Sequence, residues 1–230
     1  HLRRSDFERA AGHLDRVGLL PGVRNLHFTR MVPAEQRAEF EGQTRRDPHL
    51  DGSLPQRFAV HPVLDEAEHY VVDFVWPLNS NISVMGLNVR SQPSNMQAIE
   101  RMRRTRTLTA TAPFDLRQEQ GQQRSGVVLR LPVWHKDEGG REQFLGALGI
   151  TVLLEDVLNA ASVHAHTQGL AWRVSDYGWL DEVGEAQDGT VIASALSSQL
   201  WDPGSQLWDP GMQWQHTLEF GGRCWVLQAQ

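Results

Sequence analysis

The sequence predicts an α+β protein, in which a helical N-terminal segment is followed by strands that pair in antiparallel fashion. In the first 20 residues, apolar side chains recur at spacings of three and four, as on one face of a helix. From Phe58 onward, runs of β-branched and aromatic residues alternate with turn-forming segments, which is typical of strands. With 230 residues, of which 40% are hydrophobic, the chain can bury one large core or two modest ones.

Helices are expected at residues 2–20, 33–45, 94–106 and 155–161. The first has an apolar stripe that includes Leu2, Phe7 and Leu14 among charged residues, and it ends at the Pro21-Gly22 step. A stripe of this kind is also suited to a helix-helix seam between two copies of the chain. We therefore expect a homodimer that forms through the N-terminal helix.

Strands are expected at residues 58–60, 70–76, 107–111, 126–133, 145–153, 171–174, 190–193 and 216–227. The first two are expected to be neighbours, joined through the turn at residues 66–68. The last three form a smaller C-terminal unit. Within that unit, Ser-Gln-Leu-Trp-Asp-Pro-Gly at 198–204 is repeated at 205–211. A single copy of so short a repeat cannot build a solenoid, so we interpret it as a duplicated loop insertion.

The composition excludes several classes of protein. The net charge of -6 argues against a nucleic-acid partner, because such proteins gather lysine and arginine against phosphates. Cys224 is the only cysteine, so neither an internal disulfide nor a cysteine-rich zinc site is expected. No apolar run approaches the roughly 20 residues that span a bilayer. Together with the start at His1, this indicates an excised soluble fragment of a larger protein, and proteolytic maturation is the alternative explanation of that start.

Catalytic and metal-binding patterns are absent from the sequence. The closest groups of metal-ligand residues are His164 with His166, and His61 with Asp65 and His69, and neither has a known ligand spacing. No serine or cysteine lies in a nucleophile-elbow motif. We therefore expect neither an enzyme nor a bound cofactor.

The eight tryptophans leave a second function open. Aromatic faces can stack on sugar rings as well as fill a core. Trp201 and Trp208 in the duplicated loop are the best candidates for such a platform. A carbohydrate-binding module is therefore the alternative hypothesis.

Several sequence blocks resemble the CHASE domain, an extracytoplasmic sensor of receptor kinases and diguanylate cyclases. The blocks are Phe28-Thr29-Arg30-Met31-Val32-Pro33, residues 70–81, Met85-Gly86-Leu87-Asn88-Val89-Arg90-Ser91, the helix at 101–106, residues 108–116 and residues 126–134. Each block alone is a weak signal. Their occurrence in this order over residues 28–160 makes a chance similarity improbable.

The resemblance implies a fold and a role. The family has a long N-terminal helix followed by two PAS-like antiparallel-sheet domains, with transmembrane helices outside both ends. On this basis we expect a signalling helix at residues 1–24, a membrane-distal ligand-binding domain at 25–145 and a membrane-proximal domain at 146–230. The ligand would be a small molecule bound in the distal domain. The chain would then be the periplasmic part of an inner-membrane receptor whose output is a cytoplasmic kinase or cyclase.

The resemblance also implies pocket residues. In cytokinin-binding members an aspartate accepts hydrogen bonds from the adenine-like ring, and Asn88 occupies that place here. An amide both donates and accepts, so the ligand's polar edge need not be the same. The backbone contact to the ring's other edge falls on Ala110. Four further candidates are polar residues in or beside apolar strands: Thr109, Thr111, Asp73 and Arg103. The alternative for these four is a cross-strand hydrogen bond or a salt bridge, such as Asp73 with Arg103.

Overall fold

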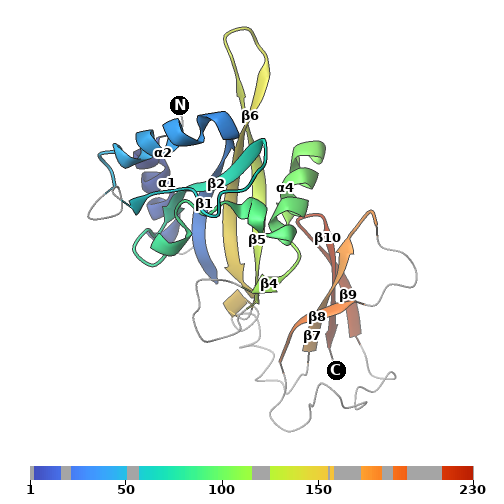
Figure 1. Cartoon of the computed structure of the whole chain (residues 1–230). Helices are drawn as coiled ribbons and strands as arrows, with labels where there is room; N and C mark the ends of the chain where they lie inside the picture. Colours follow the sequence, from blue (N-terminus) through green and yellow to red (C-terminus); the bar gives the residue numbers. More distant parts are fainter. Residues whose placement is uncertain are drawn as a thin grey trace.

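The computed structural model describes residues 3–16, 22–50, 57–115, 125–154, 156–157, 172–182, 189–195 and 214–229. These residues form two antiparallel sheets with helices packed against the first sheet (Figure 1). The α+β class predicted from the sequence is therefore confirmed.

The first sheet has the strand order β2-β1-β6-β5-β3, and β4 also pairs with β5. Its strands are β1 (Val23–Pro33), β2 (Glu68–Trp76), β3 (Thr109–Ala110), β4 (Phe114–Asp115), β5 (Ser125–Lys136) and β6 (Glu142–Leu153). The hairpin of β5 and β6 extends beyond the rest of the sheet, at the top of Figure 1. Because β6 pairs in this sheet up to Leu153, we propose that the boundary of the first domain lies after residue 154 rather than at 145.

Helices and 3₁₀ turns surround this sheet. They are α1 (Arg4–Arg16), η1 (Ala34–Gln36), α2 (Arg37–Arg45), η2 (Ile82–Val84), η3 (Val89–Ser91) and α4 (Pro93–Thr105). The long N-terminal helix expected from the sequence is not confirmed, because the described residues contain 13 residues of it, as α1, and residues 1–2 and 17–21 lie outside the described part of the chain. Phe7 of α1 is buried, and its ring centroid lies 5.7 Å from that of Phe74 in β2. The apolar stripe of this helix thus packs on the chain's own sheet, which removes Phe7 from any seam between two copies.

The expected strand at residues 58–60 is not a strand. The place beside β2 is taken by β1, in a register that runs from Leu26 opposite Trp76 to Pro33 opposite Glu68. The backbone at residues 58–60 is instead bound by side chains of α2. Arg45 Nε donates to the Phe58 carbonyl over 2.9 Å, and the Val60 amide donates to Glu41 Oε1 over 3.1 Å. These two side-chain contacts satisfy polar groups that a neighbouring strand would otherwise bind.

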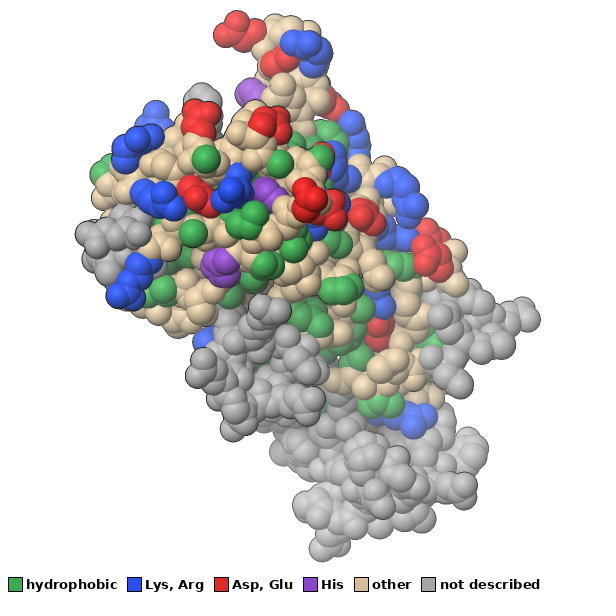
Figure 2. Space-filling view, viewed as in Figure 1, with side chains coloured by type: hydrophobic (Ala, Val, Ile, Leu, Met, Phe, Trp, Pro, Cys, Tyr) green, Lys and Arg blue, Asp and Glu red, His purple; other side chains and the backbone are tan. Residues whose placement is uncertain are grey.

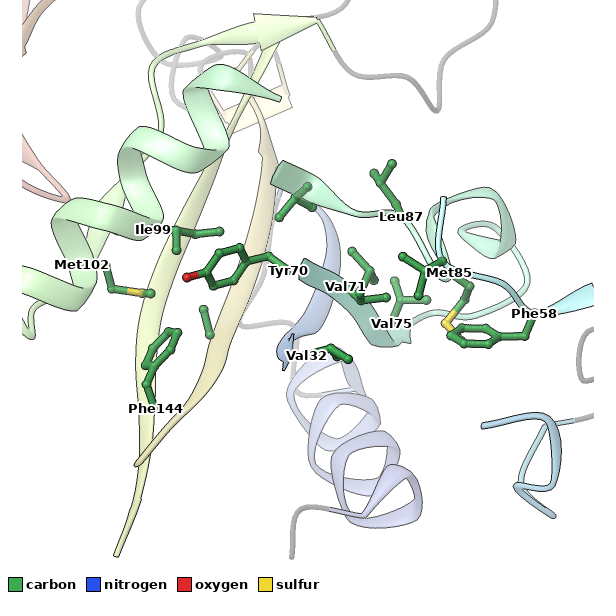
Figure 3. Close-up of a cluster of buried hydrophobic side chains, with 14 of the residues drawn as sticks. Val32, Phe58, Tyr70, Val71, Val75, Met85, Leu87, Ile99, Met102 and Phe144 are labelled. Atoms are coloured by element: carbon green, nitrogen blue, oxygen red, sulfur yellow. The ribbon is translucent and has the colours of Figure 1, made fainter. Parts of the chain in front are cut away.

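The main hydrophobic core contains residues of the first sheet, α4 and the segment at 85–89. Figure 3 shows the ring of Tyr70 directed toward Ile99 and Met102 of α4, with Phe144 of β6 beside it. Ile99 and Met102 have no exposed surface. Burial of each such side chain contributes about 1.5–3 kcal/mol, so this contact fixes α4 on the sheet.

The second sheet has the order β8-β7-β10-β9, formed by β7 (Trp172–Trp179), β8 (Thr190–Ala195), β9 (Trp214–Phe220) and β10 (Arg223–Ala229). The single strand expected at 216–227 is two strands, because Gly221 and Gly222 form a turn with φ of 56° and 77°. This turn reaches the first sheet, where the Gly221 carbonyl accepts a 2.8 Å hydrogen bond from the Ala110 amide.

Candidate functional site

A cavity of about 50 Å³ lies between the first sheet and the segment at residues 84–95. The sheet forms the floor of the cavity and the segment at 84–95 covers it, and both contain polar as well as apolar side chains. The lining residues are Asn25, His27, Val72, Val84, Leu87, Val89, Gln92, Asn95, Phe114, Val128, Arg130 and Thr151. A concave site of mixed apolar and oriented polar groups is the usual form of a small-molecule site.

Arg130 is the only charged side chain among these lining residues, and it is 1% exposed. It lies on β5 two residues after Val128, so the period of a strand places both side chains on the cavity face. The guanidinium binds neutral groups. Nε and Nη2 donate to Asn95 Oδ1, the first over 3.1 Å, and Nη1 donates to Thr29 Oγ1 over 3.1 Å. Burial lowers the pKa of Arg130 to about 9, so the side chain is still positively charged at pH 7.

His27 lies beside Arg130 across the sheet. Gly149 of β6 is paired with His27 on one side and with Arg130 on the other. A Cβ at Gly149 would collide with His27 Nε2, so glycine makes room for the imidazole at this position. Burial, and then the charge of Arg130, lower the pKa of His27 from 6.5 to about 3. The imidazole is therefore neutral at physiological pH.

A chain of amides fixes the tautomer of this imidazole. Asn81 Nδ2 donates to the Pro77 carbonyl over 2.8 Å, so Asn81 Oδ1 faces Asn25 and accepts from its Nδ2 over 3.0 Å. Asn25 Oδ1 must then face His27 Nδ1, at 3.0 Å, and accept its proton. This leaves His27 Nε2, which lies over Gly149, as the hydrogen-bond acceptor of the ring.

Asn88 is completely buried, but it is not among the residues that line the cavity. Its Oδ1 accepts from the Tyr70 amide over 3.1 Å, and its Nδ2 lies 3.2 Å from His69 Nδ1 and 3.3 Å from the Pro62 carbonyl. These contacts connect β2 to the segment that covers the cavity. Its direct contact with a ligand stays a prediction.

The three candidates around β3 are also bound within the protein. The Ala110 amide, expected to face a ligand, donates to Gly221 instead. Thr109 Oγ1 donates to the Thr107 carbonyl over 3.2 Å, and Thr111 Oγ1 accepts from the Val128 amide over 3.0 Å. All three candidates are buried, and none lines the cavity. Both threonines therefore form local or cross-strand hydrogen bonds, which is the alternative to ligand binding that the sequence left open.

Asp73 and Arg103 do not bind each other. Asp73 accepts from Arg30 Nε over 2.6 Å and lies 3.5 Å from Arg4 Nη2 of α1. Burial raises the pKa of Asp73, and the two arginines oppose this change.

Arg103 contacts a different part of β2. Its Nη1 donates to Glu68 Oε2 over 2.8 Å and to Tyr70 Oη over 2.6 Å. Asp73 and Arg103 both border a second, wide concavity, which extends from α1 and α2 to the β5–β6 hairpin. The structure therefore does not bring the six predicted residues together at one cavity, and their roles in binding stay predictions.

In the described part of the chain, no three histidine, cysteine, aspartate or glutamate side chains are grouped as a metal site, and no helix is long and apolar enough to cross a bilayer. His164, His166, Trp201 and Trp208 lie outside the described residues. On the face seen in Figure 2, acidic and basic side chains are interspersed rather than gathered into a basic patch.

The family model of the CHASE domain matches residues 1–192. The chain belongs to the CHASE domain family. CHASE domains are sensor domains outside the cytoplasm, so the receptor class expected from the sequence blocks is confirmed. No curated protein matches the chain.

Two solved structures are similar to this CHASE domain. An extracellular ligand binding receptor from Desulfohalobium retbaense DSM5692 is 14% identical, with a TM-score of 0.54 over 96% of this chain and 32% of that one. At this identity the likeness shows the fold alone, and the CHASE chain spans about a third of that receptor's length. The ligand-binding domain of the Pseudomonas aeruginosa PAO1 amino-acid chemoreceptor PctC, solved with GABA, is 11% identical, with a TM-score of 0.43 over 100% of this chain and 81% of that one.

Sequence reasoning missed the two central residues of the cavity in this CHASE domain. The signal for Arg130 was present, because one arginine interrupts the apolar run Val127-Val128-Leu129-Arg130-Leu131. His27 between Leu26 and Phe28 gave a similar signal. The sequence alone does not show whether the polar end of Arg130 or His27 faces solvent or the interior. The direction depends on which strands lie beside each residue.

Proposed function

We propose that this chain is the ligand-binding part of a transmembrane receptor and that a small molecule binds in the cavity over β1, β2, β5 and β6. The observation that carries the proposal is the cavity itself, which has a buried arginine and a neutral histidine on its floor. Apolar groups of Val72, Leu87 and Val128 form much of its remaining wall. Such a site can hold a small organic molecule with one polar end and one apolar end.

The helix α4 supports a route from the cavity to the second sheet. Its first turn contains Asn95, which lines the cavity, and the preceding Gln92 does so as well. Further along α4, Arg101 contacts the second sheet and the turn that follows β7. Its guanidinium carbon lies 4.5 Å from the centroid of the Trp179 ring in β7, and its Nη1 lies 3.2 Å from Glu182 Oε1 in the turn. A helix of 13 residues is about 20 Å long and moves as a rigid unit. A ligand that displaces Asn95 would therefore shift the contact at Arg101.

In the proposed mechanism, α4 transmits ligand binding from the cavity to the second sheet. A ligand changes the equilibrium between two arrangements only by its difference in affinity for them. The two arrangements proposed here differ in how α4 and the first sheet pack against the turn at 221–222. The resulting signal passes through flanking membrane helices to a cytoplasmic kinase or cyclase. A homodimer through α1 stays a prediction, with the partly exposed Leu14 rather than Phe7 as its contact.

The test is a thermal-shift screen with purines, amino acids, carboxylates and neutral lipophilic molecules. A ligand at 100 times its dissociation constant stabilises the folded state by about 2.7 kcal/mol, which raises Tm by several degrees. The variant Val84→Phe places a larger side chain at the cavity wall and is expected to abolish the shift.

Ile82→Phe is the matched control. Ile82 belongs to the same 3₁₀ turn as Val84, is 48% exposed and does not line the cavity. This variant is expected to keep the shift. If every compound is inactive, or if Val84→Phe binds as the wild type does, the cavity is not the ligand site.

A further inference from the structure

We propose that the ligand of this cavity carries a single carboxylate group, which binds to the guanidinium of Arg130. This inference rests on the function proposed above and adds the chemical class of the ligand. Four observations support it: the missing counter-charge, the free donors of the guanidinium, the uncharged neighbours of Arg130, and the size of the cavity.

Arg130 differs from other buried arginines of this protein in its charge balance. Arg4 pairs with Asp47 over 2.7 Å, and Arg223 pairs with Asp176 over 2.6 Å. In the described part of the chain, Arg130 has no carboxylate partner. A buried charge without a counter-charge is unfavourable, and folded proteins rarely contain one without a role. The position of Arg130 on a cavity wall gives access to an anion that is not part of the chain.

The free donors of Arg130 fit a carboxylate. A guanidinium has five N–H groups. Three of them are used, two by Asn95 Oδ1 and one by Thr29 Oγ1. The other two, one on each terminal nitrogen, have no acceptor among the described residues. A carboxylate offers two oxygens at a spacing that matches a pair of guanidinium N–H groups.

The groups around Arg130 limit the ligand to one negative charge. The neighbours on the cavity wall include Gln92, Asn95 and Thr151, which are uncharged, and His27, which is neutral. One guanidinium balances one carboxylate. A phosphate dianion would leave a buried negative charge without a partner, which is unfavourable for the same reason as an unpaired arginine.

The cavity volume indicates the size of the ligand group that it can enclose. One buried water needs about 10–15 Å³ of such space, so a cavity of about 50 Å³ holds about four water-sized groups. Acetate and propionate have four and five non-hydrogen atoms, which corresponds to this size. Their alkyl groups would contact the apolar wall at Val72 and Val128. A short aliphatic monocarboxylate is therefore the class we infer.

The experiment compares each acid with its amide. Isothermal titration of the wild-type chain with acetate and propionate, at constant ionic strength, is compared with acetamide and propionamide. Each pair has nearly the same shape, so the comparison isolates the charge. We expect binding of at least one acid and at least tenfold weaker binding of its amide. Equal binding of acid and amide, or no binding of either acid, would overturn the inference.

Two variants assign the effect to the residue. Arg130→Gln removes the charge and retains a group that can bind Asn95, and it is expected to abolish acid binding. Without a carboxylate present, its Tm is expected to be no lower than that of the wild type, because an unpaired buried charge is removed. Arg9→Gln is the control, since Arg9 lies on α1 with a side chain that is 78% exposed. This control is expected to bind the acid as the wild type does.

The outcomes separate the two proposals. If a neutral compound from the screen binds and Val84→Phe abolishes that binding, while neither acid binds, the cavity is a ligand site and the carboxylate inference is wrong. If an acid binds equally well to the wild type and to Arg130→Gln, the anion binds elsewhere. Should Arg130→Gln fail to fold, the comparison of acid and amide on the wild type still decides the ligand class.

Discussion

Lowering the pH is expected to destabilise the folded chain through His27. This imidazole is 5% exposed and donates to Asn25 beside the charge of Arg130. Burial, and then Arg130, lower its pKa from 6.5 to about 3. In the unfolded chain the imidazole is solvated and has its ordinary pKa. Between these two values the folded state binds fewer protons than the unfolded state, so stability falls as the pH is lowered.

The size of the loss follows from these two pKa values. A tenfold difference in proton affinity corresponds to about 1.36 kcal/mol. Between pH 7.5 and pH 5, the shift from 6.5 to about 3 gives a loss of about 2 kcal/mol in the free energy of unfolding. The loss begins near pH 6.5, continues as the pH falls, and stops growing below about pH 3, where the folded imidazole also takes up a proton.

The assay is urea unfolding at pH 7.5 and pH 5, with the wild type compared with His27→Gln. The glutamine can still donate to Asn25 and does not titrate. His69 is also buried and has a lowered pKa, but it is present in both proteins and cancels in the comparison. The wild type is expected to lose about 2 kcal/mol more than the variant. Equal losses in the two proteins would refute the neutral, buried state of His27.

Two further predictions concern buried ion pairs and are tested by urea unfolding at pH 7.5. Asp73→Asn removes a carboxylate shared by Arg4 and Arg30, so it is expected to destabilise the chain by about 3 kcal/mol. A loss below about 1 kcal/mol would show that Asp73 does not hold α1 on the sheet. Arg223→Met leaves the carboxylate of Asp176 buried and unpaired, with an expected loss of about 3–5 kcal/mol. Arg141→Met, whose side chain is 85% exposed, is the control and is expected to cost less than about 1 kcal/mol, and equal losses in these two variants would contradict the prediction.

Local sequence patterns located most of the regular elements. The run at 70–76 falls within β2, and the helix expected at 94–106 corresponds to α4 at Pro93–Thr105. In both elements the apolar pattern of the sequence matches the structure that forms. Apolar residues alternate or run continuously in the strand, and they recur at spacings of three and four in the helix. The order of the family's blocks identified the receptor class, because that order is itself a property of the sequence.

Other elements depended on their neighbours in space. The segment Val23–Pro33 has few features of a central strand, since Asn25, His27 and Arg30 interrupt its apolar residues. It becomes one because β2 and β6 bind its backbone from both sides. Residues 58–60 show the reverse case, in which a β-rich run is bound by α2 side chains and forms no strand.

The candidate site shows the same division. The sequence by itself determined the α+β class and the membership in the sensor family. Only the tertiary structure decided that Arg130 and His27 form the floor of the cavity while Asn88 and Ala110 are bound within the protein. The physical reason is that a polar side chain in a strand has no preference of its own for the interior. Whether it binds a ligand, another residue or water depends on the groups that the paired strands and the covering helix place around it.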